Sequence, residues 1–241
     1  MDPFDPLPQN LTATRTALHR LATYVIAPVR HQATGRFGLR ATDSGFGTPT
    51  FDGRRIRVHG LDLIDEPANG PTRTSPITTL SAAADFLGTV VDAETAAEGD
   101  SPPVGDVDAD LEIEKPSSLW LGRWFGAAFD ALGQVRADDE SVEGSEPQLW
   151  PGHFDPAIEI GDENHRGSYG ASPGDDAIAE PYLYLSVWWP DRLNLNTQDP
   201  KWNSSTFTGS VLRVSDFPSD RNPVEVASEF WRDARDRLAA G

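Results

Sequence analysis

The residues best suited to chemistry lie in two stretches, QLWPGHFD (148–155) and SYGASPGDDAIAEPYLYL (168–185). The first supplies an imidazole and a carboxylate, His153 and Asp155. The second supplies three carboxylates and, at its end, two phenols: Asp175, Asp176, Glu180, Tyr182 and Tyr184. Histidine and carboxylate side chains can transfer protons or hold a divalent cation. We therefore predict His153 and Asp155 as catalytic candidates and the residues of the second stretch as ligand-binding candidates.

Gly170-Ala171-Ser172-Pro173-Gly174 matches the letter pattern of a hydrolase nucleophile elbow. In that architecture the backbone N–H of the residue after the serine helps to form the oxyanion hole, but here that residue is Pro173, which has no N–H. The required histidine would also follow the serine, whereas the last histidine of the chain is His165. Pro173-Gly174 instead favours a type II turn, with glycine at the position of positive φ.

A metal site is the second interpretation of the same residues. In an extended segment His153 and Asp155 would project to one side, and Asp175, Asp176 and Glu180 would join them if the intervening strands paired. Turns are themselves rich in aspartate, however, and a single histidine is more often structural, so the turn interpretation stays the favoured one. The run DVDADLEIEKPS is not an EF-hand, since Leu111 and Ser117 stand where glycine and glutamate are required.

The stretch YLYLSVWWPD alternates along a strand. Tyr182, Tyr184, Ser186 and Trp188 would share one face, and the opposite face would be apolar. Tyrosine and tryptophan beside carboxylates and amides can stack on and hydrogen-bond a sugar or another small polar ligand. The alternative is that the large aromatic side chains fill the core between sheet and helix.

These residues must be positioned by an α+β fold with mostly antiparallel sheets. Apolar spacing and capping residues predict helices at 10–25, 75–88, 116–135 and 222–240. Short strands are expected at 37–42, 48–51, 54–60, 61–64, 157–161, 167–172, 182–188 and 210–217. Each half ends in a strand pair that leads into a proline-started helix, so we expect two weakly duplicated halves within one integrated domain, residues 1–241. Solvated acidic loops are expected near 92–115 and 137–147.

Composition narrows the class of protein. The 241 residues carry a formal charge of −18, which would repel nucleic acid, and 38% are hydrophobic, enough for a sizeable core. The chain has no cysteine. Its first residues do not show the basic and apolar regions of a signal peptide, and no long uncharged apolar run follows. We expect a soluble, acidic, cytoplasmic protein that binds neither nucleic acid nor membrane and carries no cofactor.

Three motifs, WP-x-HFD, SPGD and EPY-x-Y, together with the segment ALHRLATYVIAPVRHQATGRFGLRATDSGFGTPTF, resemble a family of uncharacterised actinobacterial proteins. The resemblance spans nearly the whole chain. It implies one integrated unit and a bacterial cytoplasmic setting, and it transfers no activity.

Our interpretation is a domain that binds a small polar ligand, with acid–base or hydrolytic chemistry as its enzymatic version. In that version His153 is the acid or base, and a carboxylate orients it or binds a divalent cation. The alternative is a non-catalytic interaction protein whose acidic loops engage a basic partner.

The turn interpretation of Ser172 gives a direct test. We expect Ser172→Ala to leave kcat of any activity of this protein largely intact, because Pro173 cannot supply the oxyanion donor. A loss of kcat by orders of magnitude, with an unchanged melting temperature, would show that Ser172 is a nucleophile.

Overall fold

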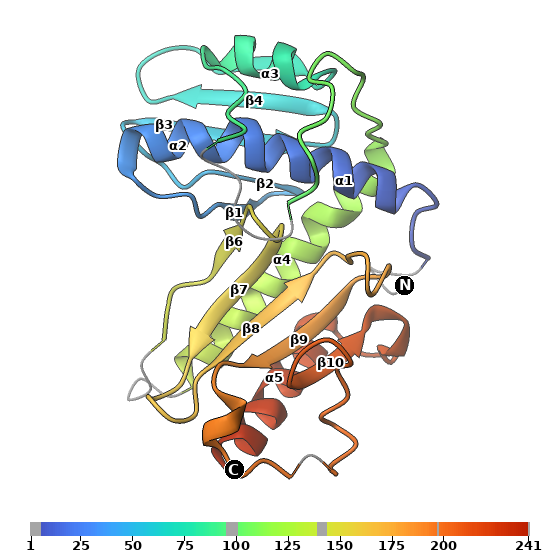
Figure 1. The fold of residues 1–241 in the computed structure, drawn as a ribbon. Helices are drawn as coiled ribbons and strands as arrows, with labels where there is room; N and C mark the ends of the chain where they lie inside the picture. The colour runs from blue at the N-terminus through green and yellow to red at the C-terminus, as the bar shows by residue number, and fades with distance from the viewer. Residues whose placement is uncertain (1–5, 95–100, 139–143, 197, 241) are drawn as a thin grey trace. The chain divides into compact units, whose positions relative to one another are not determined.

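The described strands form two antiparallel five-stranded sheets, which helices cover (Figure 1). The computed structural model describes residues 6–94, 101–138, 144–196 and 198–240. Both sheets follow chain order, β1-β2-β3-β4-β5 and β10-β9-β8-β7-β6. The predicted α+β class with mostly antiparallel pairing is confirmed, and the two halves are similar in architecture.

The chain divides into two compact units. The first, here the N-terminal unit, comprises residues 6–126 and 149–155; the second, the C-terminal unit, comprises the described residues of 127–148 and 156–240. Among the described residues the chain crosses from one unit to the other three times, so neither unit is one continuous segment. The single integrated domain expected from the sequence stays a prediction.

The N-terminal unit begins with a helical rod: α1 (Leu11–Leu21), a π-helical segment (Ala22–Ile26) and α2 (Ala27–Thr34). The helix starts after Asn10 as predicted, but the Asn10 side chain does not cap it; its amide donates to Glu114. Pro28 does not end the helix. The π turn lies just before it, where the chain must accommodate a residue without N–H and with a bulky ring.

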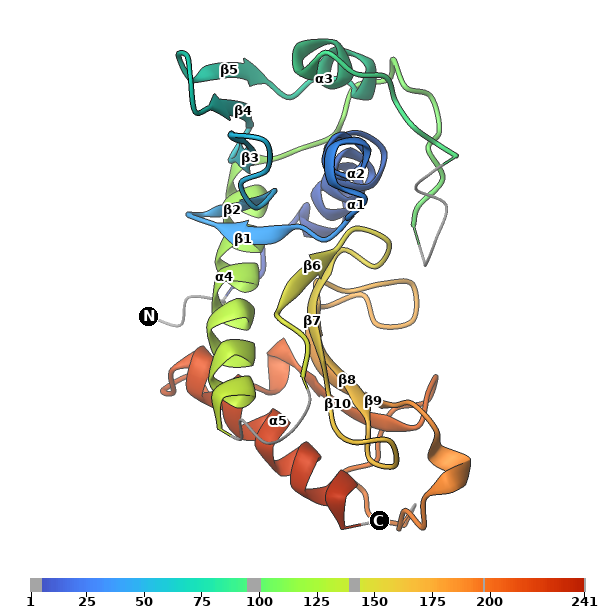
Figure 2. The ribbon, with the colours of Figure 1, turned by 90° about the vertical axis from the view of Figure 1, so that its left-hand side faces the viewer.

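The first sheet comprises β1 (Arg40–Thr42), β2 (Gly45–Gly47), β3 (Arg54–His59), β4 (Asp62–Pro67) and β5 (Arg73–Pro76). The strand expected at 48–51 is wrong; the pairing strand is β2, immediately before it. A Cβ at Gly45 would lie 1.9 Å from the Val58 carbonyl oxygen, so this approach of β2 to β3 needs glycine. In Figure 2 the helical rod and α3 lie on one side of the sheet.

The helix α3 (Leu80–Leu87) starts later than the sequence predicts. Ser75-Pro76 ends the edge strand β5 and does not open the helix, and Thr79 is the N-cap, since its hydroxyl accepts from the Ala82 N–H at 3.0 Å. Gly88 ends the helix with φ 72, as expected.

The acidic segment 101–114 contains no helix or strand, but its backbone packs on the helical rod and α3. The Tyr24 hydroxyl donates to the Pro102 carbonyl at 2.7 Å, the Arg20 Nε donates to the Val104 carbonyl at 2.9 Å, and the Leu111 N–H donates to the Thr78 carbonyl at 2.7 Å. Leu111 is buried. Backbone hydrogen bonds and buried Leu111 anchor this loop, while its acidic side chains are exposed. Residues 95–100 lie outside the described part.

The central helix α4 (Lys115–Ala137) is amphipathic as predicted: Trp120, Trp124, Ala128, Leu132 and Val135 are buried. Of the second acidic stretch, 139–143 lie outside the described residues, while Asp138 pairs with Arg232 on the last helix. Within the described ranges no helix is both long and apolar enough to cross a membrane.

The second sheet comprises β6 (Gln148–Trp150), β7 (Asp155–Ile160), β8 (Gly167–Ser172), β9 (Tyr182–Val187) and β10 (Gly209–Arg213), followed by α5 (Pro223–Ala239). Short 3-10 turns occupy Pro190–Arg192 and Val214–Asp216. The Asn222 side chain caps α5 by accepting from the Val224 N–H, with Pro223 in the first position as predicted.

One face of the second sheet, its inner face, packs against α5. Tyr169, Ala171, Leu183 and Leu185 on this face are buried. A Cβ at Gly167 would meet both Leu185 on β9 and Leu238 on α5. Fully buried Trp231 of α5 donates its indole N–H to the Tyr184 carbonyl at 3.0 Å. The opposite face of the sheet, its outer face, therefore carries the intervening residues of β8 and β9, among them Tyr182 and Tyr184.

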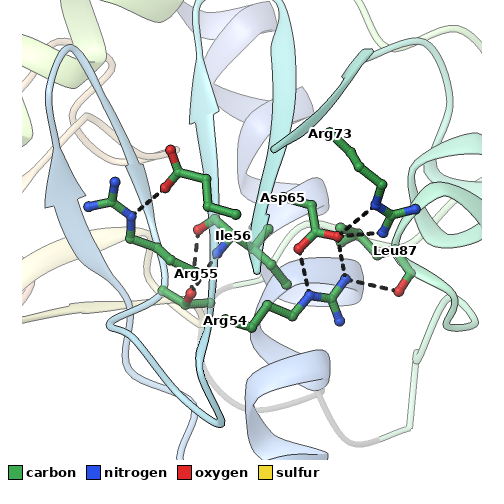
Figure 3. A network of polar contacts seen from close by, with 8 residues as sticks. Arg54, Arg55, Ile56, Asp65, Arg73 and Leu87 are labelled. Carbon is green, nitrogen blue, oxygen red and sulfur yellow. Dashed lines mark hydrogen bonds and ion pairs between the residues drawn. The ribbon is translucent and has the colours of Figure 1, made fainter. Parts of the chain in front are cut away.

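A buried carboxylate joins β3, β4, β5 and α3 in the N-terminal unit (Figure 3). Arg54 donates to both oxygens of Asp65, at 2.7 and 3.2 Å, and to the Leu87 carbonyl at 3.1 Å. Arg73 also pairs with Asp65, and its guanidinium lies 4.9 Å from the centre of the Phe86 ring. Burial would raise the pKa of Asp65, but hydrogen bonds and charge from Arg54 and Arg73 outweigh it and lower the pKa.

We expect Asp65→Asn to lower the free energy of unfolding by about 3 kcal/mol, because it leaves two arginines around a buried site without their counter-charge. Urea unfolding followed by tryptophan fluorescence measures this. The control is Glu66→Gln, since Glu66 also pairs with two arginines, Arg55 and Arg57, but is more exposed. It should cost less than about 1 kcal/mol. Equal losses would show that burial does not strengthen the Asp65 network.

Candidate functional site

The WPGHFD stretch forms a turn over residues 151–154 that leads into β7. Phe154 has φ 56, a left-handed conformation that bulky residues rarely adopt, and its N–H donates to the Trp150 carbonyl at 2.7 Å. Such strain persists only where the surroundings fix it, and it concentrates at functional sites. The turn is therefore a candidate part of a functional site.

Two side chains of the helical rod hold this turn. His19 Nε2 lies 2.8 Å from the Pro151 carbonyl oxygen, and the Thr23 hydroxyl donates to the same oxygen at 2.7 Å. Because a carbonyl oxygen only accepts, Nε2 carries the His19 proton and Nδ1 is left as an acceptor. Thr23 belongs to the π-helical segment, so the unusual helix geometry and the strained turn meet at one carbonyl.

The Phe154 ring fills an aromatic cluster in the N-terminal unit. It packs edge-on against Phe46 and Phe125, with ring centres 5.1 Å away in each case, and stacks on His19 at 5.2 Å. Phe154 is fully buried. Burial of one large aromatic side chain contributes about 2 kcal/mol, similar to the cost of the left-handed backbone.

His153 and Asp155 flank Phe154 and differ in exposure. His153 is exposed at the end of the turn, whereas Asp155, the first residue of β7, is 4% exposed. The two predicted catalytic residues are thus positioned by the same strained turn.

Buried His19 has a strongly perturbed pKa. Burial lowers the pKa of His19 to about 4; the hydrogen bonds to the backbone of Pro151 and Gly152 oppose this, and the charges of His153 and Arg15 add to it. His19 is therefore neutral at pH 7 and serves as a fixed hydrogen-bond donor to the turn. Perturbed histidines are more common at functional sites than elsewhere, although structural networks also contain them.

The predicted turn at Pro173-Gly174 lies in the C-terminal unit. Gly174 has φ 98, the positive value that the turn interpretation requires, and its N–H donates to the Ser172 hydroxyl at 3.1 Å. Asp175 closes the following loop: its carboxylate accepts from the N–H groups of Ala177 and Ile178, both at 2.8 Å. The Tyr182 hydroxyl also donates to this carboxylate. Asp175 thus stabilises the loop and orients Tyr182.

The two remaining carboxylates of this stretch, Glu180 and Asp176, differ in their contacts and exposure. Glu180 accepts from the Ser215 N–H at 3.1 Å and pairs with Arg213 at 3.7 Å, so it fastens the loop to the end of β10. Asp176 is exposed.

Tyr182 and Tyr184 share the outer face of the second sheet, as the alternation predicts. Their neighbours across the ladder are Ser172 and Gly170 on β8 and Arg213 and Val211 on β10. A Cβ at Gly170 would lie 2.5 Å from Cζ of Tyr184, so the tyrosine ring lies against bare backbone. Tyr182 is buried and Tyr184 is half-buried, with ring centres 6.2 Å apart; Phe207 lies 6.1 Å from Tyr184.

The outer face also carries Trp188, just beyond β9. It is 38% exposed and donates its indole N–H to the Ser168 hydroxyl at 2.8 Å. The Arg166 guanidinium lies 5.1 Å from the Trp188 ring. The chain thus places partly exposed aromatic rings and hydroxyls on one face, a combination suited to a polar ligand that also stacks.

The structure groups the predicted residues in two places. His153 and Asp155 belong to the N-terminal unit, and the stretch from Asp175 to Tyr184 belongs to the C-terminal unit. Within the residues that the structure describes, no three His, Asp, Glu or Cys side chains gather closely enough to hold a metal ion.

Sequence reasoning missed His19, Thr23 and the conformation of Phe154. His19 and Pro151 are 132 residues apart, so no local spacing joins them. The proline after Trp150 and the histidine in a helical pattern gave no signal of a shared hydrogen bond.

The pKa of His19 predicts how stability depends on pH. His19 binds a proton near pH 6.5 in the unfolded chain and only near pH 4 in the folded chain. The contribution of neutral His19 to the free energy of unfolding is therefore complete above pH 6.5 and is lost as pH falls toward 4. We expect the free energy of unfolding to drop by about 3 kcal/mol over this range. His19→Gln should reduce this slope in urea titrations at successive pH values. His59→Gln, the control at the end of β3, should keep it; equal slopes in wild type and His19→Gln would refute the assignment.

Comparison with known proteins gave no match to this chain among family models, curated proteins or solved structures.

Proposed function

We propose that this protein binds a small polar ligand on the outer face of the β7–β10 sheet. The observation that carries the proposal is the placement of Tyr184. Its ring lies against the bare backbone of Gly170, on the face opposite α5, and stays half-buried. A ring held against the sheet backbone offers a rigid stacking surface that loses little entropy on binding.

Polar groups around Tyr184 support this ligand class. Ser168 and Ser186 pair across the ladder on the same face, and both are half-buried. Asp176 is exposed on the adjacent loop. Hydroxyl and carboxylate groups beside an aromatic ring suit a neutral ligand with several hydroxyl groups, such as a sugar. A cytoplasmic location is part of the proposal and agrees with the lack of cysteine.

Acid–base chemistry by His153 and Asp155, which lie in the N-terminal unit, is proposed separately from the ligand site on the outer face. Its support is the strained backbone at Phe154, which fixes an exposed imidazole next to a buried carboxylate. This role stays a prediction.

A second candidate function is interaction with a basic partner. It is favoured by the fixed backbone of the acidic segment 101–114. Its backbone packs inward, while Asp106, Asp108, Asp110 and Glu112 are exposed. Fixed carboxylates in a row attract a basic surface without first being ordered. Asp106→Asn combined with Asp110→Asn should weaken binding of a polylysine probe and reduce its dependence on salt; unchanged binding would remove this candidate.

Untargeted mass spectrometry of small molecules retained by gently purified protein tests the main proposal. We expect a polar, hydroxyl-rich compound in wild-type samples. Tyr184→Leu, which removes the ring and hydroxyl but keeps an apolar side chain above Gly170, should lower retention at least threefold, since stacking contributes about 1 kcal/mol.

The control is Phe37→Leu, which removes a partly exposed ring from the N-terminal unit, where Phe37 stacks on His31. It should retain the compound as wild type does. If no polar compound is retained, or if Tyr184→Leu retains as much as wild type, the outer face is not the binding surface.

A further inference from the structure

The stretch Leu11–Thr42 differs in charge from the rest of the chain. It contains no aspartate or glutamate and five arginines, Arg15, Arg20, Arg30, Arg36 and Arg40, within a protein of net charge −18. In an acidic chain, most arginines have carboxylate partners close by. A run of 32 residues without an aspartate or glutamate leaves these arginines to find partners in other segments of the chain.

Arg30, on α2, is the arginine of this stretch whose surroundings are least able to satisfy it. It is only 8% exposed. Its Nε and Nη1 atoms are enclosed and have no hydrogen-bond partner among the described residues. A guanidinium stays charged at any physiological pH, and burying a charge without a partner is costly.

Arg36 adds a second positive charge to Arg30. The chain reverses at Gly35, which has φ 71 and donates its N–H to the His31 carbonyl at 2.7 Å. The Arg36 N–H then donates to the Thr34 hydroxyl, and Phe37 stacks on His31 with ring centres 3.9 Å apart. Burial lowers the pKa of Arg30, and the nearby charge of Arg36 lowers it further.

Local contacts do not neutralise this pair. Arg36 is exposed, and no ion pair joins either arginine to a carboxylate in the described part of the chain. By contrast, buried Asp65 receives two arginines in the same unit. The end of α2 therefore holds two adjacent cations and an excess of unused N–H donors.

We propose that Arg30 and Arg36 bind the oxyanion group, phosphate or carboxylate, of a small ligand. Such a group supplies both missing elements, a negative charge and several acceptor oxygens for guanidinium donors. A long polyanion is disfavoured, because the rest of the chain would repel it. This site lies in the N-terminal unit and does not depend on the function proposed for the outer face of the second sheet.

The test is thermal unfolding of the full chain at increasing concentrations of inorganic phosphate or acetate, with sodium chloride at matched ionic strength as the reference. A ligand that binds only the folded state raises the melting temperature in proportion to the logarithm of its concentration above Kd. We expect phosphate, acetate or both to raise the melting temperature beyond the chloride reference. A response to phosphate alone assigns a phosphoryl group, and a response to acetate assigns a carboxylate as well.

Variants connect the response to the arginines. Arg30→Met keeps the length of the side chain and removes its charge, so it should abolish the response and melt no lower than wild type in chloride. Arg36→Met, a surface change, should weaken the apparent affinity about tenfold, the effect of one charge-assisted contact. The matched control is Arg123→Met, since Arg123 is exposed on α4 in the same unit and should leave the response unchanged.

Two results would overturn the proposal. One is a wild type that responds to neither anion beyond the chloride reference. The other is a response that persists in both Arg30→Met and Arg36→Met. A lower melting temperature of Arg30→Met in chloride would show that the guanidinium is satisfied inside the fold, which also contradicts the proposal.

Discussion

The hydrogen bond from the buried indole of Trp231 to the backbone carbonyl of Tyr184 fixes α5 against the centre of the second sheet. Because neighbouring residues of a strand point to opposite faces, the side on which α5 packs decides the environment of each residue on β9. Leu183 and Leu185 are buried on the side of α5, and Tyr182 and Tyr184 are placed on the other side. A shift of β9 by one residue would exchange these sets, bury the tyrosine hydroxyls under α5 and expose the leucines. The stacking surface of the proposed ligand site is therefore a consequence of core packing.

Two buried charged residues of the N-terminal unit show how differently the chain treats charge. Asp65 is enclosed and accepts hydrogen bonds from Arg54 and Arg73, one of which also fastens the last carbonyl of α3 (Figure 3). Arg30 is almost as enclosed and has two nitrogen atoms without a partner. A chain that surrounds a buried carboxylate with two guanidinium groups has the means to satisfy a buried arginine too. An arginine left unsatisfied next to Arg36 is better explained by a role outside the fold than by poor packing.

The six-residue strands could be predicted from the sequence, and several of the shortest strands could not. The strands expected at 167–172 and 182–188 match β8 and β9 closely. In contrast, β2 is Gly-Phe-Gly and β5 ends in proline, compositions that local propensity assigns to turns; long-range pairing overrides it. The same holds for the site. The turn at Gly174 follows from local chemistry, whereas the hold of His19 and Thr23 on Pro151 depends on tertiary contacts between distant segments.

Side chains that already make hydrogen bonds or ion pairs within the fold have a structural role, and the exposed side chains beside them can contact a ligand. The carboxylate of Asp175 already receives two backbone N–H groups and the Tyr182 hydroxyl, and Glu180 holds Ser215 and Arg213, so both act as supports. What the outer face offers is a ring, hydroxyls and one exposed carboxylate, which suit a neutral ligand in a protein of net charge −18. The same net charge does not forbid an anion at Arg30. Beyond about 8 Å, salt screens exposed charges at physiological ionic strength, so the adjacent charge of Arg36 outweighs distant carboxylates.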